Sequence, residues 1–169
     1  MERHGLCHRG NFGGFGVKRV IVSGFFNPLH GGHIDMIEAA KKMGDWLIVI
    51  VNNDIHQMTK KGKIILDENN RARLMSALRD VDEVIIGIDP EHPNWPSTET
   101  LRLIADKYPK DELIFANGGD RSSADRLPGP EGDLCIERGI KMVFGVGSHA
   151  VEKRDSSTRI NQATGHETK

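Results

Sequence analysis

The 169-residue sequence has few cysteines, few aromatic residues and no long apolar run. Its two cysteines, Cys7 and Cys135, are far apart and follow no metal-binding or redox spacing, so they are typical of free thiols in a reducing cytoplasm. No apolar run approaches the roughly 18–20 residues that a membrane-spanning helix needs. Residues 1–16 also lack the apolar core of a secretory signal. These absences predict a cytoplasmic protein without a membrane partner.

An excess of either charge is also absent. The 23 basic and 24 acidic residues leave a net charge of −1, and Tyr108 is the single tyrosine. A nucleic-acid-binding module would need a basic face with interleaved aromatic residues. We therefore expect no nucleic-acid partner, and the length fits about one domain with a substantial core.

Short apolar runs alternate with helical patterns along the chain. They predict strands at 18–23, 46–51, 83–88, 112–116 and 140–145, and helices at 32–43, 68–79, 97–108 and 131–138. The runs do not alternate with polar residues, which is typical of strands buried on both faces of a parallel sheet. Ser97 is expected to cap the third helix, and Leu74, Met75 and Leu78 to form the apolar face of the second. The sequence thus predicts a single α/β domain with a Rossmann-like, doubly wound, five-stranded parallel sheet.

This domain is expected to span residues 18–160. Residues 1–17, which contain Gly13-Gly14-Phe15-Gly16, are predicted to be a flexible leader, and residues 161–169 a frayed polar tail. In such sheets ligands bind beyond the carboxyl ends of the strands, often where a strand leads into a helix.

Residues 23–33 lie at such a junction and read Ser-Gly-Phe-Phe-Asn-Pro-Leu-His-Gly-Gly-His. A helix N-terminus offers unpaired N–H groups and a positive dipole end, and two histidines add donors that can be charged near neutral pH. This combination predicts a phosphate-handling site. The glycine patterns of dinucleotide-binding folds and phosphate loops are missing, and His-x-x-His has no cysteine or carboxylate partner at zinc-ligand spacing, so no protein-bound metal is predicted.

The segment closely resembles the signature Gly-x-Phe-(Asp/Asn)-x-x-His-x-Gly-His of the nucleotidylyltransferase superfamily. The resemblance extends to about residue 160 and is closest to the branch of glycerol-3-phosphate cytidylyltransferases and heptose-phosphate adenylyltransferases. Matching residues are Gly24, Phe26, Asn27, His30, Gly32, His33, Asn52-Asn53-Asp54, the lysine loop of Lys60, Lys61 and Lys63, Arg71, Val81-Asp82-Glu83-Val84, Gly118-Gly119-Asp120 and Ser156-Ser157-Thr158.

The resemblance implies that an acceptor phosphate attacks the α-phosphorus of ATP or CTP and releases pyrophosphate without a covalent enzyme intermediate. The implied catalytic residues are His30, His33 and Lys61, with Lys60 or Lys63 as substitutes. The implied nucleotide-binding residues are Gly24, Phe25, Phe26, Asn27, Gly32, Arg71, Gly119, Asp120, Ser156, Ser157 and Thr158. A Mg²⁺ ion would bridge the triphosphate, held mostly by substrate and water. The implied acceptor is a phosphorylated sugar or polyol, and the implied assembly is a homodimer.

Structural interpretations stay open beside these roles. Phe25 and Phe26 also fit a hydrophobic core, the lysines a solvated loop and Arg71 a helix surface; Gly118-Gly119-Asp120 also fits a turn and Ser156-Ser157-Thr158 a helix cap. Trp95 is a candidate for acceptor contact.

Several departures from the branch leave the acceptor open. Asn27-Pro28 is more like the branch that adenylylates nicotinamide mononucleotide or phosphopantetheine, so a cofactor precursor is the alternative acceptor. Asp155 stands where an apolar residue is usual, and the loop 121–133 is unusual, with Arg121 and Arg126 available for a second phosphate. A nucleotide-binding regulator without turnover is a further hypothesis.

Overall fold

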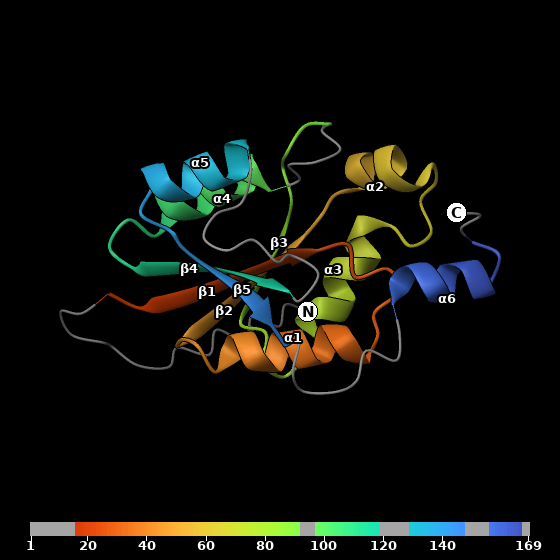
Figure 1. Ribbon diagram of the computed structural model, residues 1–169, viewed down its shortest axis with the longest axis horizontal. Coiled ribbons are helices and arrows are strands. Elements are labelled where there is room, and N and C mark those ends of the chain that lie inside the picture. The colour runs from red at the N-terminus through yellow and green to blue at the C-terminus, as the bar shows by residue number, and fades with distance from the viewer. Residues whose placement is uncertain (1–15, 92–96, 119–128, 148–155, 167–169) are drawn as a thin grey trace, which may run out of the picture.

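The computed structural model describes residues 16–91, 97–118, 129–147 and 156–166 (Figure 1). The sheet has five parallel strands in the order β3-β2-β1-β4-β5. The strands are β1 (Lys18–Gly24), β2 (Trp46–Val51), β3 (Glu83–Ile86), β4 (Glu112–Gly118) and β5 (Lys141–Val146). The helices are α1 (Gly31–Lys41), α2 (Asp54–Lys61), α3 (Glu68–Ser76), α4 (Thr98–Lys107), α5 (Pro130–Glu137) and α6 (Ser157–Ala163). The predicted fold class, a single α/β domain with a doubly wound five-stranded parallel sheet, is confirmed.

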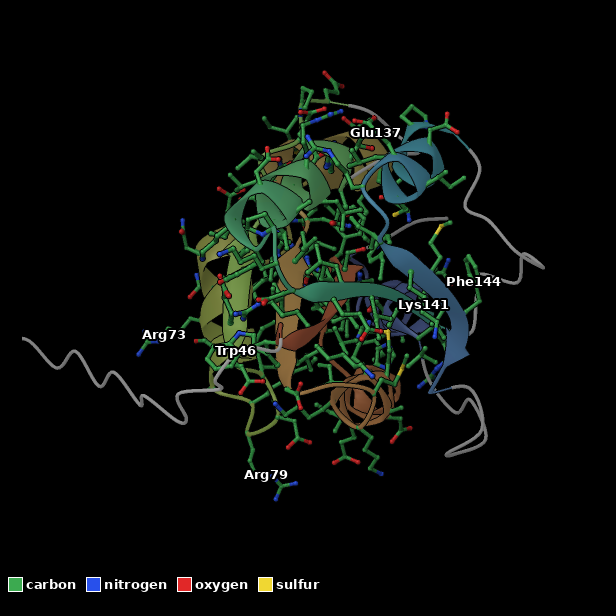
Figure 2. All side chains as sticks on the ribbon, turned by 90° about the vertical axis from the view of Figure 1, so that its left-hand side faces the viewer. Trp46, Arg73, Arg79, Glu137, Lys141 and Phe144 are labelled. Carbon is green, nitrogen blue, oxygen red and sulfur yellow. The ribbon has the colours of Figure 1, made fainter. Side chains whose placement is uncertain are left out.

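Helices cover both faces of the sheet, which is why β2 is apolar throughout and β1 is apolar at its three buried positions, 20–22. On β1 and β2, Ile21 and Ile48 pack with α4 and α5, whereas Val20 and Val49 pack with α1 and α3. Successive side chains of a strand point to opposite faces, so a strand between two helical layers needs apolar residues at every position. Figure 2 shows this sandwich from the side on which β2 begins at Trp46, with α4 and α5 on one side and α1 on the other.

The strand order places the candidate site. The chain builds outward from β1 to β2 and β3, and then crosses to the other side of β1 to add β4 and β5. The carboxyl ends of β1 and β4, at Gly24 and Gly118, therefore flank the point where the order reverses, which is where open parallel sheets bind ligands. The loop of residues 25–30 leaves β1 at this edge and leads directly into α1.

Helix α4 is capped differently from the expectation. Ser97 is its N-cap residue, as predicted, but the Ser97 hydroxyl has no hydrogen-bond partner among the described residues. Instead the buried Asp89 carboxylate, from the segment after β3, accepts the N–H groups of Glu99 at 2.6 Å and of Thr100 at 3.2 Å. A carboxylate satisfies orphan donors as a serine does and also complements the helix dipole.

Two further expectations about helices were wrong. The lysine loop begins within a helix, since Lys60 and Lys61 are the last residues of α2 and only Lys63 lies in the following loop. On α3, Met75 is fully buried but Leu74 is 46% exposed, so Leu74 does not belong to the apolar face of that helix. Apolar type alone does not fix which side of a short helix faces the core.

The described ends of the chain also differ from the expectation. Val17, assigned to the leader, is hydrogen-bonded to Asp111 and Glu112. Residues 161–163, assigned to a frayed tail, continue α6, and Asn161 is buried. Within the described ranges no helix is long and apolar enough to cross a bilayer.

Candidate active site

The loop between β1 and α1 is shaped by a buried aromatic residue. Phe26 has a left-handed backbone with φ 51°, and its side chain packs among α1, β1 and β2 residues. A Cβ at Gly24 would lie only 3.0–3.3 Å from the Phe26 ring, so the glycine allows the ring to fold back against the end of β1. Phe26 is therefore a core residue that fixes the loop, the structural interpretation that the sequence left open.

The two histidines lie together at the start of α1. His30 is the N-cap residue, and its backbone N–H donates to Nδ1 of His33 at 3.3 Å. The two imidazole rings are 3.8 Å apart between centroids and tilted by 32°, while the rings of Phe26 and His33 meet in a T-shaped contact with centroids 5.1 Å apart. This arrangement leaves little freedom to either ring and places both at the N-terminal end of the helix.

The electrostatics of His33 correct one expectation. Burial, followed by the positive charge of His30, lowers the pKa of His33 from 6.5 to about 4. In the free protein at neutral pH His33 is therefore neutral rather than charged. Because Nδ1 accepts the His30 N–H, the remaining ring proton is on Nε2, which makes Nε2–H a hydrogen-bond donor.

Gly32 makes room for the His30 ring, whereas its predicted role in nucleotide binding stays a prediction. It is exposed on the first turn of α1, and a Cβ there would lie 3.1 Å from Cε1 and 3.3 Å from Nδ1 of His30. The neighbouring Gly31 has open space at the same position. The glycine at 32 therefore keeps the approach to the His30 ring free.

Helix α6 packs onto the loop of residues 25–30, which joins β1 to α1 and is called the histidine loop below. The Ser157 hydroxyl donates to the Pro28 carbonyl at 2.9 Å, and the buried Asn161 amide donates to the Asn27 carbonyl at 3.2 Å. Ser156 caps α6 by accepting the Arg159 N–H at 3.1 Å, and Thr158 is exposed. The Ser-Ser-Thr run is thus both a helix cap and a contact of the histidine loop.

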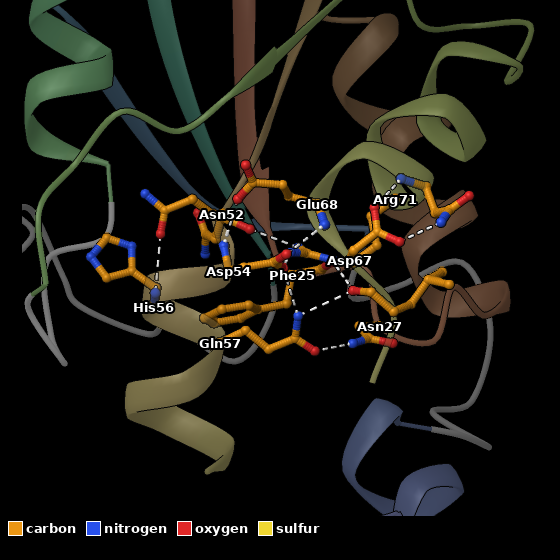
Figure 3. Close-up of polar contacts among 12 residues, drawn as sticks. Phe25, Asn27, Asn52, Asp54, His56, Gln57, Asp67, Glu68 and Arg71 are labelled. Atoms are coloured by element: carbon orange, nitrogen blue, oxygen red, sulfur yellow. Dashed lines mark hydrogen bonds and ion pairs between the residues drawn. The ribbon is translucent and has the colours of Figure 1, made fainter. Parts of the chain in front are cut away.

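Arg71 is placed differently from the role that the resemblance implies. Its side chain is 0% exposed and forms an ion pair with Asp54 at 2.6 Å. It also donates to three backbone carbonyls, of Phe25 at 3.0 Å, Asn52 at 2.6 Å and Leu66 at 2.8 Å (Figure 3). Four of its five donors are therefore occupied, and Arg71 ties the ends of β1 and β2 to α2 and α3 beneath the loop.

Among the lysines, Lys60 has a defined position at the loop. Its Nζ lies 5.3 Å from the centroid of the Phe25 ring, close enough for a cation–π contact. Lys61 is partly buried at the end of α2, and Lys63 is exposed beyond it. The structure thus places the Lys60 ammonium group beside Phe25 in the histidine loop. Lys60 is one of the two lysines that the sequence offered as substitutes for Lys61.

The sequence profile of the cytidylyltransferase-like family matches residues 21–162, which is most of the chain. The protein belongs to the cytidylyltransferase-like family. This family places it in the nucleotidylyltransferase superfamily that the sequence resembled.

Three similar proteins are informative. An FAD synthase from Ferroglobus placidus is 42% identical over 71 residues, which cover 42% of this chain and 46% of that protein. A glycerol-3-phosphate cytidylyltransferase from Bacillus subtilis is 39% identical over 79 residues, covering 47% and 57%. The crystal structure of a lipopolysaccharide core biosynthesis protein from Thermoplasma volcanium superposes with a TM-score of 0.56 at 30% identity, covering 76% of this chain and 96% of that one. The chain thus spans about half the length of these two curated relatives.

Some predicted site residues of this cytidylyltransferase-like chain lie outside the described residues. These are Gly119, Asp120, Trp95, Asp155, Arg121 and Arg126. Gly118, the last residue of β4, is described, and a Cβ there would lie 3.1 Å from Sδ of Met36 on α1. Over the described ranges, no group of three or more His, Cys, Asp or Glu side chains is arranged to hold a metal ion.

Sequence reasoning missed Gln57, which joins the histidine loop to α2. Its side chain accepts a hydrogen bond from Asn27 Nδ2 and donates to Asp54 at 3.0 Å. A signal for the helix that carries it was present: Asn53 and Gly62 bracket it as an N-cap residue and a left-handed C-cap glycine. That pattern would have found the helix, but not the partners of its buried face.

Proposed function

We propose that this protein is a nucleotidylyltransferase that transfers a nucleoside monophosphate from ATP or CTP to a phosphorylated sugar or polyol and releases pyrophosphate. The observation that carries the proposal is the pair of adjacent imidazoles, His30 and His33, at the N-terminus of α1 by the switch point of the sheet. Membership of the cytidylyltransferase-like family supports it.

The geometry suits this reaction because nucleotidyl transfer needs positioning and charge stabilisation more than a protein nucleophile. His33 would donate from Nε2–H to an α-phosphate oxygen on which negative charge develops. The first-turn N–H groups of α1 and the cation of Lys60 or Lys61 would bind the other phosphate oxygens. The acceptor phosphate oxygen would then bond to the α-phosphorus as the bond to the pyrophosphate breaks.

The Ser-Ser-Thr run has a supporting role in this proposal. By resemblance, Ser156, Ser157 and Thr158 would face the β- and γ-phosphates. Ser157 already donates to Pro28 in the free protein, and the exposed Thr158 hydroxyl is the more accessible donor. Gly119 and Asp120 would contact the base or ribose beyond β4.

Mg²⁺ is proposed as the metal that the triphosphate carries into the site. The described residues around the histidine pair offer hydrogen-bond donors and lysines rather than a carboxylate cluster, and this set fits an ion held by phosphate oxygens and water. When bound, the ion would neutralise charge on the triphosphate.

A second acceptor class is favoured by a specific observation. The relatives named FAD synthase match this chain at 41–47% identity over 69–72 residues, including the 46% identical protein of Archaeoglobus profundus. This supports the alternative of an adenylyltransferase that acts on a cofactor precursor. A flavin mononucleotide carries its phosphate on a polyol chain, so it belongs to both acceptor classes.

The experiment measures pyrophosphate release with Mg²⁺ and either ATP or CTP against a panel of acceptors. The panel contains glycerol 3-phosphate, heptose phosphates, flavin mononucleotide, nicotinamide mononucleotide and phosphopantetheine. Release that requires one triphosphate and one acceptor would establish the activity. Triphosphate binding in a thermal-shift assay without release from any pair would favour the regulator without turnover.

The His33→Ala variant then tests the mechanism. Losing one donor to the transition state should lower kcat by on the order of 10²-fold. His166→Ala, at an exposed histidine of the same chain, is the control and should keep wild-type turnover. Near-normal turnover of folded His33→Ala would overturn the assignment. We also propose a homodimer by analogy with the family, and a monomer mass in light scattering would contradict it.

A further inference from the structure

The side chain of Gln57 is 0% exposed and makes four hydrogen bonds, of which Figure 3 shows those to Asn27 and Asp54. Its Oε1 accepts from the Ile65 backbone N–H at 2.9 Å and from Asn27 Nδ2. Its Nε2 donates to the Leu66 carbonyl at 3.1 Å and to Asp54 Oδ1 at 3.0 Å. Both ends of this buried amide are therefore occupied, as a buried polar group requires.

The backbone at residues 65–66 fixes which way this amide points. The Ile65 N–H can only donate and the Leu66 carbonyl can only accept, so the Gln57 oxygen must face the first and its nitrogen the second. Rotating the amide by half a turn would set two donors against each other at Ile65 and two acceptors at Leu66. Side-chain amides are often ambiguous in orientation, but this one is determined by its neighbours.

A fixed Gln57 dictates the chemistry of residue 27. The oxygen that faces Ile65 also faces the side chain of residue 27, so this residue must donate a hydrogen bond. Asn27 does so through Nδ2, whereas an aspartate carboxylate would place two acceptors together in a buried setting. The superfamily signature accepts Asp or Asn at this position, and the orientation of Gln57 explains why this chain carries Asn.

Residue 27 in turn holds the loop that carries the histidines. Its backbone carbonyl accepts from Asn161, and His30 follows three residues later. We propose that Gln57 is a positioning residue, which selects a hydrogen-bond donor at residue 27 and thereby fixes the histidine loop against α2. Its effect on turnover rests on the proposed function, but its effect on the folded protein does not.

Asn27→Asp tests the polarity directly, with Asn69→Asp on the exposed face of α3 as the matched control. Facing Gln57 Oε1 in a buried position, the new carboxyl would have its pKa raised above the ordinary value of about 3.9. A folded-state pKa above the unfolded value means that stability is lost as pH rises through the raised pKa. Protonation at low pH restores a donor, so the variant should approach wild-type stability as the pH falls.

The charged groups near residue 27 are present in both wild type and variant, so their own titration cancels to first order in the difference between the two proteins. Asp54 binds the same Gln57 and is paired with Arg71; His30 and His33 lie on α1, and α6 meets residue 27 through the neutral Asn161. Thermal unfolding is therefore compared with wild type at each pH. We expect a Tm lower by about 5 °C or more near pH 8, and a difference at least halved near pH 5. Asn69→Asp should show no such trend. An Asn27→Asp Tm equal to that of the wild type at pH 8 would overturn the proposal. A Tm difference that does not change with pH would do the same.

Turnover supplies the second readout. The ratio of variant to wild-type kcat should rise at least threefold between about pH 8 and pH 6, because protonation restores the donor that holds the loop. A ratio that stays constant would overturn the positioning role. If the wild type releases pyrophosphate with no pair of substrates, the proposed function fails, whereas the stability arm still decides the polarity. If Asn27→Asp does not fold at any pH, hydrogen exchange at the wild-type Ile65 amide replaces it, and fast exchange there would contradict the fixed Gln57.

Discussion

His33 has both a structural contact and a role in the proposed function, and the sequence alone does not distinguish the two. Its Nδ1 accepts the N–H of His30 at the start of α1, and in the proposed function its Nε2–H would donate to a phosphate oxygen. Burial against Phe26 and the nearby His30 keep the ring neutral. A neutral donor needs no proton from solvent before it can bind a phosphate oxygen, and binding of an anion would raise its pKa.

The titration of His33 is the first prediction at this scale. NMR titration of the free protein should give a pKa of about 4 for His33. His30→Gln should raise this pKa, since it removes a positive charge, but the pKa should stay below 6.5 because burial, the larger cause, persists. A His33 that titrates near 6.5 in the wild type would contradict the buried, neutral ring.

The lowered pKa of His33 also determines in which direction the stability of the protein changes with pH. Between about pH 6.5 and pH 4 the unfolded chain binds a proton at His33 that the folded protein does not, so this residue makes stability fall as the pH falls through that range. Urea unfolding of His33→Gln over the same range should show a shallower decline than wild type. Equal slopes would contradict this.

The paired glycines of the first turn, Gly31 and Gly32, give a further prediction. Gly32→Ala places a methyl group 3.1 Å from the His30 ring and should lower kcat by about tenfold through displacement of that ring. Gly31→Ala meets open space and should leave kcat within about twofold while raising helix stability by up to about 1 kcal/mol. Pyrophosphate-release kinetics and urea unfolding measure the two effects. Equal losses from both variants would show that the turn, rather than the His30 ring, is sensitive to the substitution.

Among the elements, α1 is positioned by a close backbone approach as well as by side chains. Gly147, just after β5, has φ +79°, and a Cβ there would lie 2.7 Å from the Cα and 2.8 Å from the N of Met36. No side chain fits between this turn and the helix. The short helix α2 is held differently, since Asp54 and Glu68 each accept the other's backbone N–H, at 3.1 and 2.7 Å, and so cap α2 and α3 together.

Gly147→Ala should therefore displace α1 and the histidines that it carries. We expect a loss of about 2–4 kcal/mol in the free energy of unfolding, because a left-handed backbone and a backbone clash add. Gly139→Ala is the matched control, with φ +66° and open space, and should cost only the conformational part, about 1 kcal/mol. Urea unfolding measures both variants. An equal loss in the free energy of unfolding would show that α1 moves away from the new methyl group at no cost.

The sequence predicted the strands well because their signal is local. β2, for example, is apolar at every position, which is typical of a strand buried between two helical layers. The histidine junction was predicted from its residues and spacing in the same way. The role of Arg71 could not be predicted, because its partners are three backbone carbonyls and a carboxylate that the fold brings together from separate segments. The same reason hid Gln57 and Asn161.

Across the whole molecule, the two ends of the strands carry different groups of residues. The histidine loop lies at the carboxyl ends of the strands, whereas Arg19, near the start of β1, lies between the rings of Tyr108 and Trp46, at 3.6 and 5.4 Å, and pairs with Asp111 at 2.5 Å. Figure 2 looks onto this second end, at Trp46. Its contacts join the starts of β1 and β2 to the end of α4 and the turn before β4.

Arg19→Met should accordingly lower stability without changing catalysis. Losing a partly buried ion pair and the cation–π contacts should cost about 1–3 kcal/mol in the free energy of unfolding. The variant should keep wild-type kcat and KM below its unfolding transition. Urea unfolding and pyrophosphate-release kinetics on the same preparation separate the two properties, and a tenfold loss of kcat would contradict their independence.

The contacts of α6 have a consequence for the order in which the protein becomes competent during synthesis. Ser157 and Asn161 bind carbonyls of the histidine loop that lie 129 and 134 residues earlier in the chain. During synthesis the ribosome adds the two histidines, Gln57 and Arg71 to the chain long before it adds Ser157 and Asn161. The nascent chain thus contains the histidines of the proposed site early but gains the contacts of α6 with their loop last, so a stalled or shortened product lacks those contacts.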